Sequence, residues 1–209
     1  FTLTKEGNTL YNYSKQIIQT YDELRHKIQE IQNVVTGTIK VVTIYSIGLH
    51  ELPPYHKKFL KKHPTVNVSV EYRRATQLYE DIVTGVADIG LVAYPQKDPR
   101  LPVTSLAADM LVLICHPDHP LAQQPKVKLS EIASHKFIAF EPDIPTRRAI
   151  DKILRDRNVE VDHAMEFDNI ETVKRAVEID AGISIVPRSP VAQEVTKKTI
   201  AMVEIEDAQ

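Results

Sequence analysis

The hydrophobic pattern of this chain separates one long helix from a series of alternating strands and helices. Residues 5–35 contain no proline and a single glycine, Gly7, and their apolar side chains recur every three or four positions, as in an amphipathic helix. Such a helix would be ~45 Å long, longer than a lobe needs, so we predict a dimerisation helix whose apolar seam packs on a partner. The alternative is a helix packed on its own domain. The seam consists of Leu10, Tyr13, Ile17, Tyr21, Leu24, Ile28 and Ile31.

After Gly37 the pattern changes to strand–helix–strand units, which build parallel sheets. We expect strands at residues 38–44, 66–72 and 88–92, with helices at 47–62 and 78–84. The same order returns later, with strands at 135–140, 164–167 and 183–186 and helices at 147–157 and 170–179. The sequence therefore predicts an α/β fold of two similar lobes, with a cleft between them that is lined by helix starts.

The first of these helical stretches contains Pro53 and Pro54, and a proline inside a helix costs a backbone hydrogen bond. We therefore expect a kink or a shifted start there, with the regular helix at 55–62. The lysines of this helix are interpreted as a solvated face, and nucleic-acid contact is the alternative.

Ligands of open α/β sheets bind beyond the carboxyl ends of the strands, where this chain carries polar residues at helix starts. Ser46, Thr76 and Thr146 are predicted to cap helices, and either Asp168 or Asn169 is expected to cap the helix that follows. The candidate binding residues are Tyr45, Ser46, Ile47, Gly48, Thr76, Pro145, Thr146, Arg147 and Asn169.

A pair of arginines at a helix start indicates an anionic ligand. The positive end of the helix dipole disfavours Arg147 and Arg148 unless an anion neutralises them, and arginine offers a bidentate fork to a carboxylate or phosphate. Gly48 would leave the amides of another helix start open to the same anion. In the alternative, both arginines point to solvent or pair with Asp143 and Asp151.

Composition narrows the function further. The 209 residues carry a formal net charge of −2, which gives no reason to expect nucleic-acid binding by the bulk of the chain. The one cysteine, Cys115, lies in an apolar run and indicates a buried structural thiol in a reducing, cytoplasmic compartment. No apolar run approaches the ~20 residues of a membrane span. The His116–His119 cluster is interpreted as a turn, and no catalytic or cofactor motif occurs, so we expect no enzyme activity, metal or cofactor.

Several short motifs resemble those of LysR-type transcriptional regulators in their order and spacing. They are Leu3–Gly7 before the long helix, Gly37–Val41, Leu52–Pro54, Gly85–Leu91, His119–Ala122 and Ala181–Pro187. Each motif is moderately specific, and together they cover nearly the whole chain. The resemblance implies a type II periplasmic-binding-protein fold with two Rossmann-like lobes, preceded by a long linker helix.

The resemblance also implies a division of labour along the chain. Residues 1–36 would be the end of a DNA-binding wing and the dimerisation linker, 37–111 lobe I and 112–209 lobe II. We expect a small anionic metabolite between the lobes, self-association as a dimer or tetramer, and DNA binding only through a winged helix-turn-helix that this sequence lacks. The family's last strand and helix, which return to lobe I, have no counterpart before Gln209.

Two other kinds of protein share this scaffold. A solute-binding protein of a transporter is the main alternative, but a monomeric receptor has no use for an exposed apolar seam. An enzyme of the prephenate dehydratase or porphobilinogen deaminase type would need catalytic carboxylates or a reactive cysteine in the cleft, and the sequence offers neither.

Overall fold

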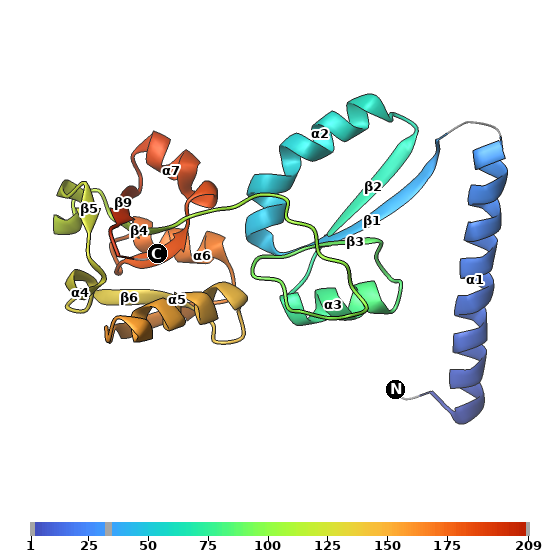
Figure 1. The fold of residues 1–209 in the computed structure, drawn as a ribbon, viewed down its shortest axis with the longest axis horizontal. Coiled ribbons are helices and arrows are strands. Elements are labelled where there is room, and N and C mark those ends of the chain that lie inside the picture. Colours follow the sequence, from blue (N-terminus) through green and yellow to red (C-terminus); the bar gives the residue numbers. More distant parts are fainter. Residues whose placement is uncertain (1–2, 32–34, 208–209) are drawn as a thin grey trace. The chain divides into compact units, whose positions relative to one another are not determined.

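The computed structural model describes residues 3–31 and 35–207, without the side chains of residues 25–27 and 29–31 (Figure 1). The chain divides into two compact units, Phe1–Ile39 with His56–Ser69 and Lys40–Tyr55 with Val70–Gln209. The predicted binding residues all belong to the second unit. The predicted lobe boundaries at residues 36 and 111 stay a prediction.

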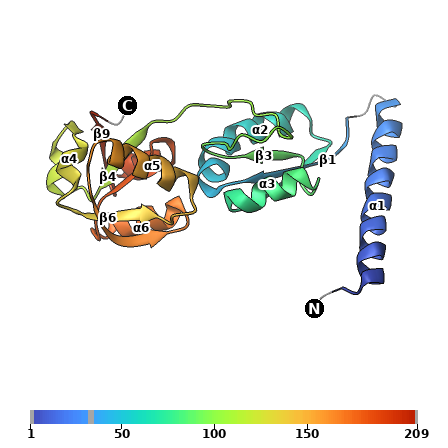
Figure 2. The same ribbon diagram turned by 60° about the horizontal axis from the view of Figure 1, so that its bottom comes forward.

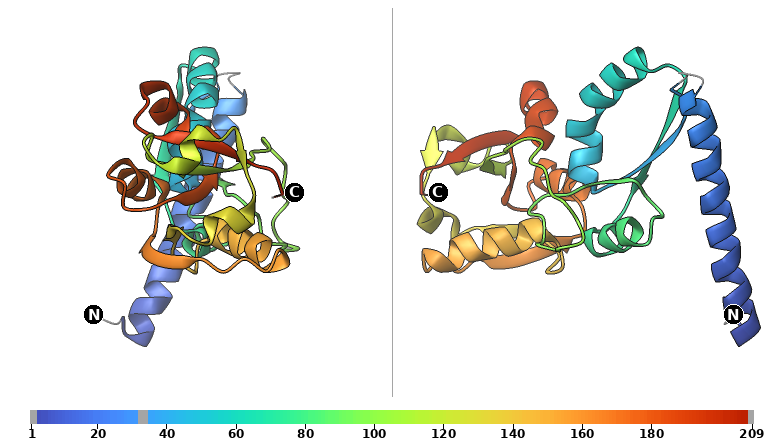
Figure 3. Two further views of the ribbon diagram at one scale, coloured as in Figure 1. Left: turned by 90° about the vertical axis from the view of Figure 1, so that its left-hand side faces the viewer. Right: turned by 45° about the vertical axis from the view of Figure 1, so that its right-hand side comes forward.

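The predicted N-terminal helix is present as α1 (Lys5–Ile31), a helix without a break (blue in Figures 1 and 3). Thr4 directly precedes it, and the Oγ1 of Thr4 accepts a hydrogen bond from the amide of Gly7 at 3.1 Å. Ile31 ends the helix, and its side chain lies outside the described residues. The other seam residues are exposed, from 49% for Ile28 to 70% for Leu10.

The first strand–helix series forms a three-stranded sheet in the order β2-β1-β3, with β1 and β3 parallel. Its strands follow the β-branched runs of the sequence, each within a residue or two of the predicted bounds. The elements are β1 (Gly37–Thr43), η1 (Ile47–Glu51), α2 (Leu52–Lys62), β2 (Val66–Tyr72), α3 (Ala75–Val83) and β3 (Ile89–Leu91).

The expected irregularity at the two prolines is confirmed, but as a π-helical turn and not as a shifted start. Residues 45–46 are already helical, and residues 47–51 form a π turn that runs directly into α2, where the amide of Leu52 bonds Ile47 O. Pro53 and Pro54 are the second and third residues of α2 and donate no backbone hydrogen bond there. The π turn makes the segment after β1 wider than an ordinary helix start.

The second series repeats the first. In it, β6 pairs in parallel with β7 on one side and with Ile183, just before β8, on the other. The order β7-β6-β8 thus matches β2-β1-β3, and Figure 2 shows α5 and α6 on either side of β6. The elements are β6 (Lys136–Phe140), α5 (Pro145–Asp156), β7 (Asp162–Phe167), α6 (Ile170–Glu178) and β8 (Ser184–Pro187).

A second sheet extends this half, in the order β5-β9-β4-β8. Strands β8 and β9 run antiparallel to β4, and β5 runs parallel to β9. The remaining elements are β4 (Leu111–Cys115), η2 (Pro120–Gln123), β5 (Lys126–Val127), α4 (Leu129–Ile132), η3 (Ser189–Val191), α7 (Ala192–Lys197) and β9 (Ala201–Ile205).

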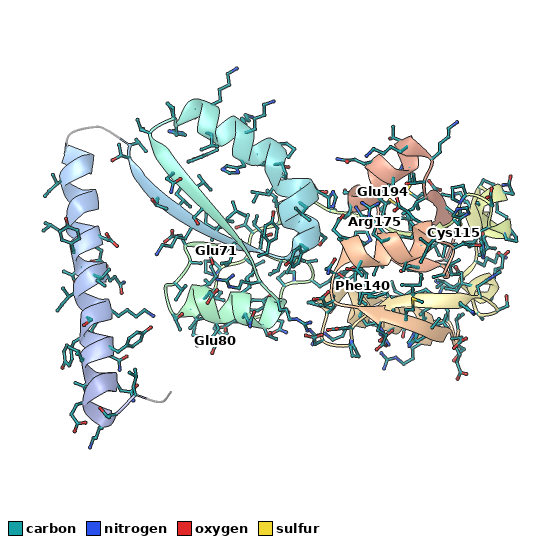
Figure 4. The ribbon with its side chains drawn as sticks, turned by 180° about the vertical axis from the view of Figure 1, so that it is seen from behind. Glu71, Glu80, Cys115, Phe140, Arg175 and Glu194 are labelled. Carbon is teal, nitrogen blue, oxygen red and sulfur yellow. The ribbon has the colours of Figure 1, made fainter. Side chains whose placement is uncertain are left out.

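The larger hydrophobic core lies in this second half, around β4, β6, β8 and α6. Cys115 is fully buried in it (Figure 4), and burial, with a smaller contribution from Asp180, raises the pKa of its thiol to about 11. The predicted structural role for this cysteine is therefore confirmed, because a thiol in this state is a poor nucleophile.

Candidate functional site

The parallel strands of the first sheet end beside each other, so the residues after them form one edge. Strand β1 ends at Thr43, and the η1 turn follows after Tyr45 and Ser46. Strand β2 ends at Tyr72, and the backbone of the next residue donates a hydrogen bond to Thr43 O at 2.9 Å. We call this the first edge. It contains the predicted residues Tyr45, Ser46, Ile47 and Gly48.

The turn at this edge is shaped by a glycine. Gly48 is buried, and a Cβ added to it would lie 2.4 Å from Thr43 Cγ2 and 2.7 Å from Tyr72 Cε1. Any larger residue would therefore displace the ring of Tyr72. Gly48 thus has a packing role, in addition to the predicted role of leaving backbone amides open to an anion. Ser46 already has helical backbone angles and makes no side-chain cap, so its predicted capping role is wrong.

Two tyrosines stack at the first edge. The rings of Tyr45 and Tyr72 have centroids 5.0 Å apart and planes 20° from parallel. Tyr45 is 45% exposed, so most of the stack's open surface belongs to it. Stacked aromatic pairs contribute ~0.5–1.5 kcal/mol beyond their buried area, and this pair therefore positions the chain after β1 relative to the end of β2.

The two arginines after β2 are held by carboxylates. Arg73 bonds Glu71 and Asp81 within its own half. Arg74 is the N-cap residue of α3, and Thr76, which is exposed, lies inside the helix rather than at its cap as predicted. No side chain caps helix α3.

The guanidinium of Arg74 pairs with three carboxylates from the second series. Its nitrogens lie 2.9 Å from Glu141, 3.0 Å from Asp143 and 3.5 Å from Asp168. Glu141 directly follows β6, after Phe140 (Figure 4), and Asp168 directly follows β7. These three acids form the second edge, at the carboxyl ends of β6 and β7.

Helix α5 starts at this second edge, and its caps differ from those predicted. Pro145 is its first residue, Ile144 is the N-cap residue, and no side chain caps the helix. Thr146 is therefore buried inside the first turn, and its predicted capping role is wrong. Asn169 does cap α6 as predicted, because its Oδ1 accepts a hydrogen bond from the amide of Thr172 at 3.0 Å.

Arg147 adopts the ion-paired arrangement that was the alternative to anion binding. The residue is 7% exposed, and its guanidinium donates to Asp151 at 2.7 Å, to Glu166 at 2.8 Å and to the carbonyl of Phe140 at 2.6 Å. Desolvation lowers the pKa of Arg147, but the bonds to the two carboxylates outweigh it and raise that pKa. The role of Arg147 as an effector ligand stays a prediction, since its charge is already balanced within the fold.

A buried ionic network surrounds Lys174 and was not predicted from the sequence. The ammonium of Lys174, a residue that is 1% exposed, lies 2.9 Å from Glu171, 2.9 Å from Glu194 and 3.1 Å from the carbonyl of Pro190. Glu171 in turn lies 2.8 Å from His50 in η1. The signal was available, because Lys174 falls on the apolar stripe of α6 between Val173 and Val177.

Hydrogen bonds from His50 and Lys174 set the charge state of Glu171. Desolvation raises the pKa of this carboxyl, but the two bonds outweigh it and leave the pKa below its usual value. Glu194, labelled in Figure 4, has one carboxylate oxygen that is buried without a hydrogen-bond partner among the described residues. The network therefore connects the turn at the first edge to α6 and α7.

Comparison with known proteins identifies the family. The family model of the LysR substrate binding domain matches residues 32–209. The chain belongs to the LysR family of transcriptional regulators. Relatives of this LysR family chain include the transcriptional regulator CysL of Bacillus subtilis (strain 168), with 24% identity over 205 residues. A probable RuBisCO transcriptional regulator of Gracilaria tenuistipitata var. liui is 28% identical over 213 residues.

Those alignments cover 98% and 99% of this LysR family chain, and 69% of each relative. The chain thus spans about two thirds of the length of these regulators. No enzyme is among the relatives named here, which agrees with a regulatory protein.

Solved structures confirm the expected fold of this LysR family chain, with its long preceding helix. The effector-binding domain of QuiR in complex with shikimate has a TM-score of 0.74 at 22% identity, over 82% of each chain. The regulatory domain of CcmR from Synechocystis PCC6803 in complex with 2-PG has a TM-score of 0.75 at 22% identity, over 82% of each chain. Full-length CbnR with its target DNA has a TM-score of 0.74 at 18% identity, over 98% of this chain and 71% of CbnR.

In the part of this chain that the structure describes, no helix is both long and apolar enough to cross a membrane. No three His, Cys, Asp or Glu side chains in the same residues are grouped so that they could hold a metal ion.

Proposed function

We propose that this chain is the effector-sensing and self-association part of a LysR-type transcriptional regulator. It binds a small molecule at the carboxyl ends of its parallel strands and relays binding through α1 to a DNA-binding module. The observation that carries this proposal is the repeated β2-β1-β3 and β7-β6-β8 arrangement in a member of this family. Structures with the same fold hold shikimate or 2-PG, which supports a small metabolite as the effector.

The effector carries a negative charge in this proposal, and Arg74 is its partner. Both Arg74 and Arg147 are paired with carboxylates, but the side chain of Arg74 is 43% exposed and that of Arg147 is 8% exposed. An anion from solvent can therefore reach Arg74 and compete with its carboxylates, and it cannot reach Arg147 in the same way. Such an exchange would free Glu141, Asp143 and Asp168 from Arg74. Effector binding would therefore favour an arrangement of the chain without these ion pairs, and this difference in affinity is what a switch needs.

Helix α1 supplies self-association in this proposal, with a second copy of the chain as its partner. Its seam repeats at the spacing of a coiled coil, and exposed apolar stripes of this length mark interaction sites on proteins. A solute-binding protein, the alternative function, gives no role to this seam. The regulator is not an enzyme in this proposal, and a cytoplasmic location follows from the single buried cysteine.

The self-association arm is tested by sedimentation of the protein and of a Leu24→Glu/Ile28→Glu variant. Two charges in the seam should convert dimers or larger assemblies to monomers, because a coiled-coil seam does not accept buried carboxylates. An Asn12→Glu/Gln19→Glu variant adds the same charge to the opposite face and should sediment as the unmodified protein does. A monomeric unmodified protein would contradict this arm and favour the solute-binding alternative.

The effector arm is tested by native mass spectrometry of the protein as purified from bacterial cells. A bound acidic small molecule should be retained, and an Arg74→Gln variant should lose it. Retention of the same molecule by Arg74→Gln would contradict the role of Arg74 and leave the family assignment unchanged.

A further inference from the structure

The second half of α2 (Figure 1) carries four lysines and no acidic residue. Residues 56–63 read His-Lys-Lys-Phe-Leu-Lys-Lys-His. Lys57, Lys58, Lys61 and Lys62 are one and four positions apart, so their side chains leave the helix on one side. All four residues are exposed. We call this set the lysine face.

The charges of the lysine face are not neutralised within the fold. No ion pair joins these lysines to a carboxylate in the part of the chain that the structure describes. On α5, by contrast, Arg147 pairs with Asp151 four positions on. On α2 the residue four positions after Lys57 is Lys61, and the other two lysines repeat this spacing. Like charges at this spacing destabilise a helix, which favours the nucleic-acid alternative over the predicted solvated face.

The surplus of positive charge is confined to one of the two compact units. The unit Phe1–Ile39 with His56–Ser69 has 8 Lys and Arg against 4 Asp and Glu, a formal charge of +4. The rest of the chain has 18 against 24, a formal charge of −6. Because the whole chain is negative, a polyanion can be attracted only by a local patch such as the lysine face.

The chemistry of the lysine face fits phosphate groups that are spaced along a backbone. Lysine is a compact point charge on a flexible stem, and it contacts phosphates without reading bases. Short lysine-rich segments of this kind are typical of nucleic-acid contacts. Protein–protein interfaces are instead depleted in lysine, so the face fits an acidic protein less well.

The lysine face belongs to the same compact unit as α1. The hydroxyl of Thr65, just after α2, donates a hydrogen bond to Val35 O at 2.6 Å, which fixes the turn after α2 to the segment after α1. Helix α1 is the element that leads to the DNA-binding module in the proposed function. The positive unit is therefore the one connected to DNA.

We propose that the lysine face of α2 binds the phosphate backbone of double-stranded DNA without regard to sequence. This goes beyond the proposed function, in which DNA is bound by a separate module. Sequence reading stays with that module, and the lysine face adds affinity that depends on salt. The partner is duplex DNA, and an acidic protein is the alternative that the test must exclude.

The test measures fluorescence anisotropy of a labelled duplex of about 25 base pairs and random sequence, titrated with the full 209-residue chain. At about 50 mM salt the dissociation constant should be on the order of 10–100 μM, in the range of non-specific DNA binding. Two to four phosphate contacts predict a slope of log K against log salt of about −1.8 to −3.6. Affinity should therefore fall about 10–150-fold between about 50 and 200 mM salt.

Two variants with equal changes of net charge locate the contact. The lysine-face variant is Lys57→Gln/Lys58→Gln/Lys61→Gln/Lys62→Gln. The control variant is Lys97→Gln/Lys126→Gln/Lys152→Gln/Lys197→Gln, at exposed positions of other segments. The first should weaken DNA binding at least about tenfold and flatten the salt slope, while the second should stay within about threefold. Circular dichroism shows whether both variants are folded.

Three results would overturn the proposal. One is that the unmodified chain does not bind DNA at low salt. Another is that the control variant loses as much affinity as the lysine-face variant, since net charge alone would then be the cause. The third is that polyglutamate binds more tightly than DNA at the same salt, which would assign the face to an acidic protein. If DNA binding fails while native mass spectrometry still finds an assembly with an acidic ligand, the proposed function stands without this inference.

Discussion

Replacement of Lys174 by methionine should lower the free energy of unfolding more than replacement of an exposed lysine does. Methionine keeps the length of the side chain but removes the ammonium that lies 2.9 Å from both Glu171 and Glu194. Glu194 then keeps a buried charge but loses its direct ion pair, and its other carboxylate oxygen already lacks a hydrogen-bond partner among the described residues. Burying an unpaired carboxylate is among the most costly changes a core can undergo.

The magnitude follows from the burial of each partner. Removal of one member of a buried ion pair costs ~3–5 kcal/mol. The full cost applies to Glu194, because its side chain is only 10% exposed. It applies less to Glu171, because that side chain is 33% exposed and keeps part of its hydration and its bond to His50. We therefore expect a loss of about 3 kcal/mol in the free energy of unfolding. For a chain of this size that lowers Tm by ~6–12 °C.

Urea unfolding followed by circular dichroism measures this loss. The control is Lys152→Met, an exposed lysine on α5, which should change stability by less than about 0.5 kcal/mol. The double variant Lys174→Met/Glu194→Met removes the stranded carboxylate and should recover a kilocalorie or more, that is about a third of the loss. Equal losses of unfolding free energy in Lys174→Met and Lys152→Met would show that Lys174 does not neutralise a buried carboxylate.

Three further predictions concern other parts of the fold. Arg147→Gln should lower the free energy of unfolding by about 2–4 kcal/mol in urea, while Arg148→Gln, at an exposed position, should lower it by less than about 0.5 kcal/mol. An Arg147→Gln variant of normal stability that no longer binds the effector would instead support the predicted ligand role of Arg147. Gly182→Ala should lower the free energy of unfolding by about 2–3 kcal/mol, because the added Cβ would lie 2.4 Å from Lys136 O. Gly85→Ala should cost only about 1 kcal/mol, because its Cβ meets nothing within 4 Å and the cost comes from a φ of +69°. Similar losses in both variants would be inconsistent with the close packing at Gly182. Burial and the neighbouring His135 and His116 lower the pKa of His119, a shift that Asp180 partly opposes. The unfolded chain therefore binds more protons, and stability should fall as pH drops below about 6.5. A His119→Asn variant keeps an acceptor for the Leu121 amide and should show a shallower fall of stability between about pH 7.5 and 5.5; an unchanged slope would remove His119 as the cause.

The strands and helices were predictable because they depend on local pattern. The β-branched run before Thr43 and the alternation up to Tyr72 each gave a strand within a residue or two. The repeat of the strand–helix order also predicted that the two halves would share one plan. Each of these elements could be predicted because its apolar periodicity is contained in a short stretch of sequence.

The caps were less predictable, because a cap depends on where the chain turns in space. Thr146 was placed at a helix start, yet Pro145 is the first helical residue and Thr146 lies buried behind it. Pro145 is itself a start signal, and it favoured the observed bounds. Thr76 was misplaced in the same way, by two residues.

The charged residues of the site depended on contacts between distant parts of the chain. Arg147 was interpreted from its own helix, but its guanidinium bonds Glu166, nineteen residues away. Arg74 pairs with Asp143, sixty-nine residues away. Sequence spacing carries no record of such pairs, so the composition of each edge could be known only from the folded chain.

Native mass spectrometry of the protein as purified shows most directly whether it is a self-associating, effector-binding regulator. We expect an assembly of two or more copies that carries an acidic small molecule. Arg74→Gln should lose the ligand, and Leu24→Glu/Ile28→Glu should lose the assembly. A monomer that carries a ligand and is unchanged by the seam variant would instead indicate a solute-binding protein.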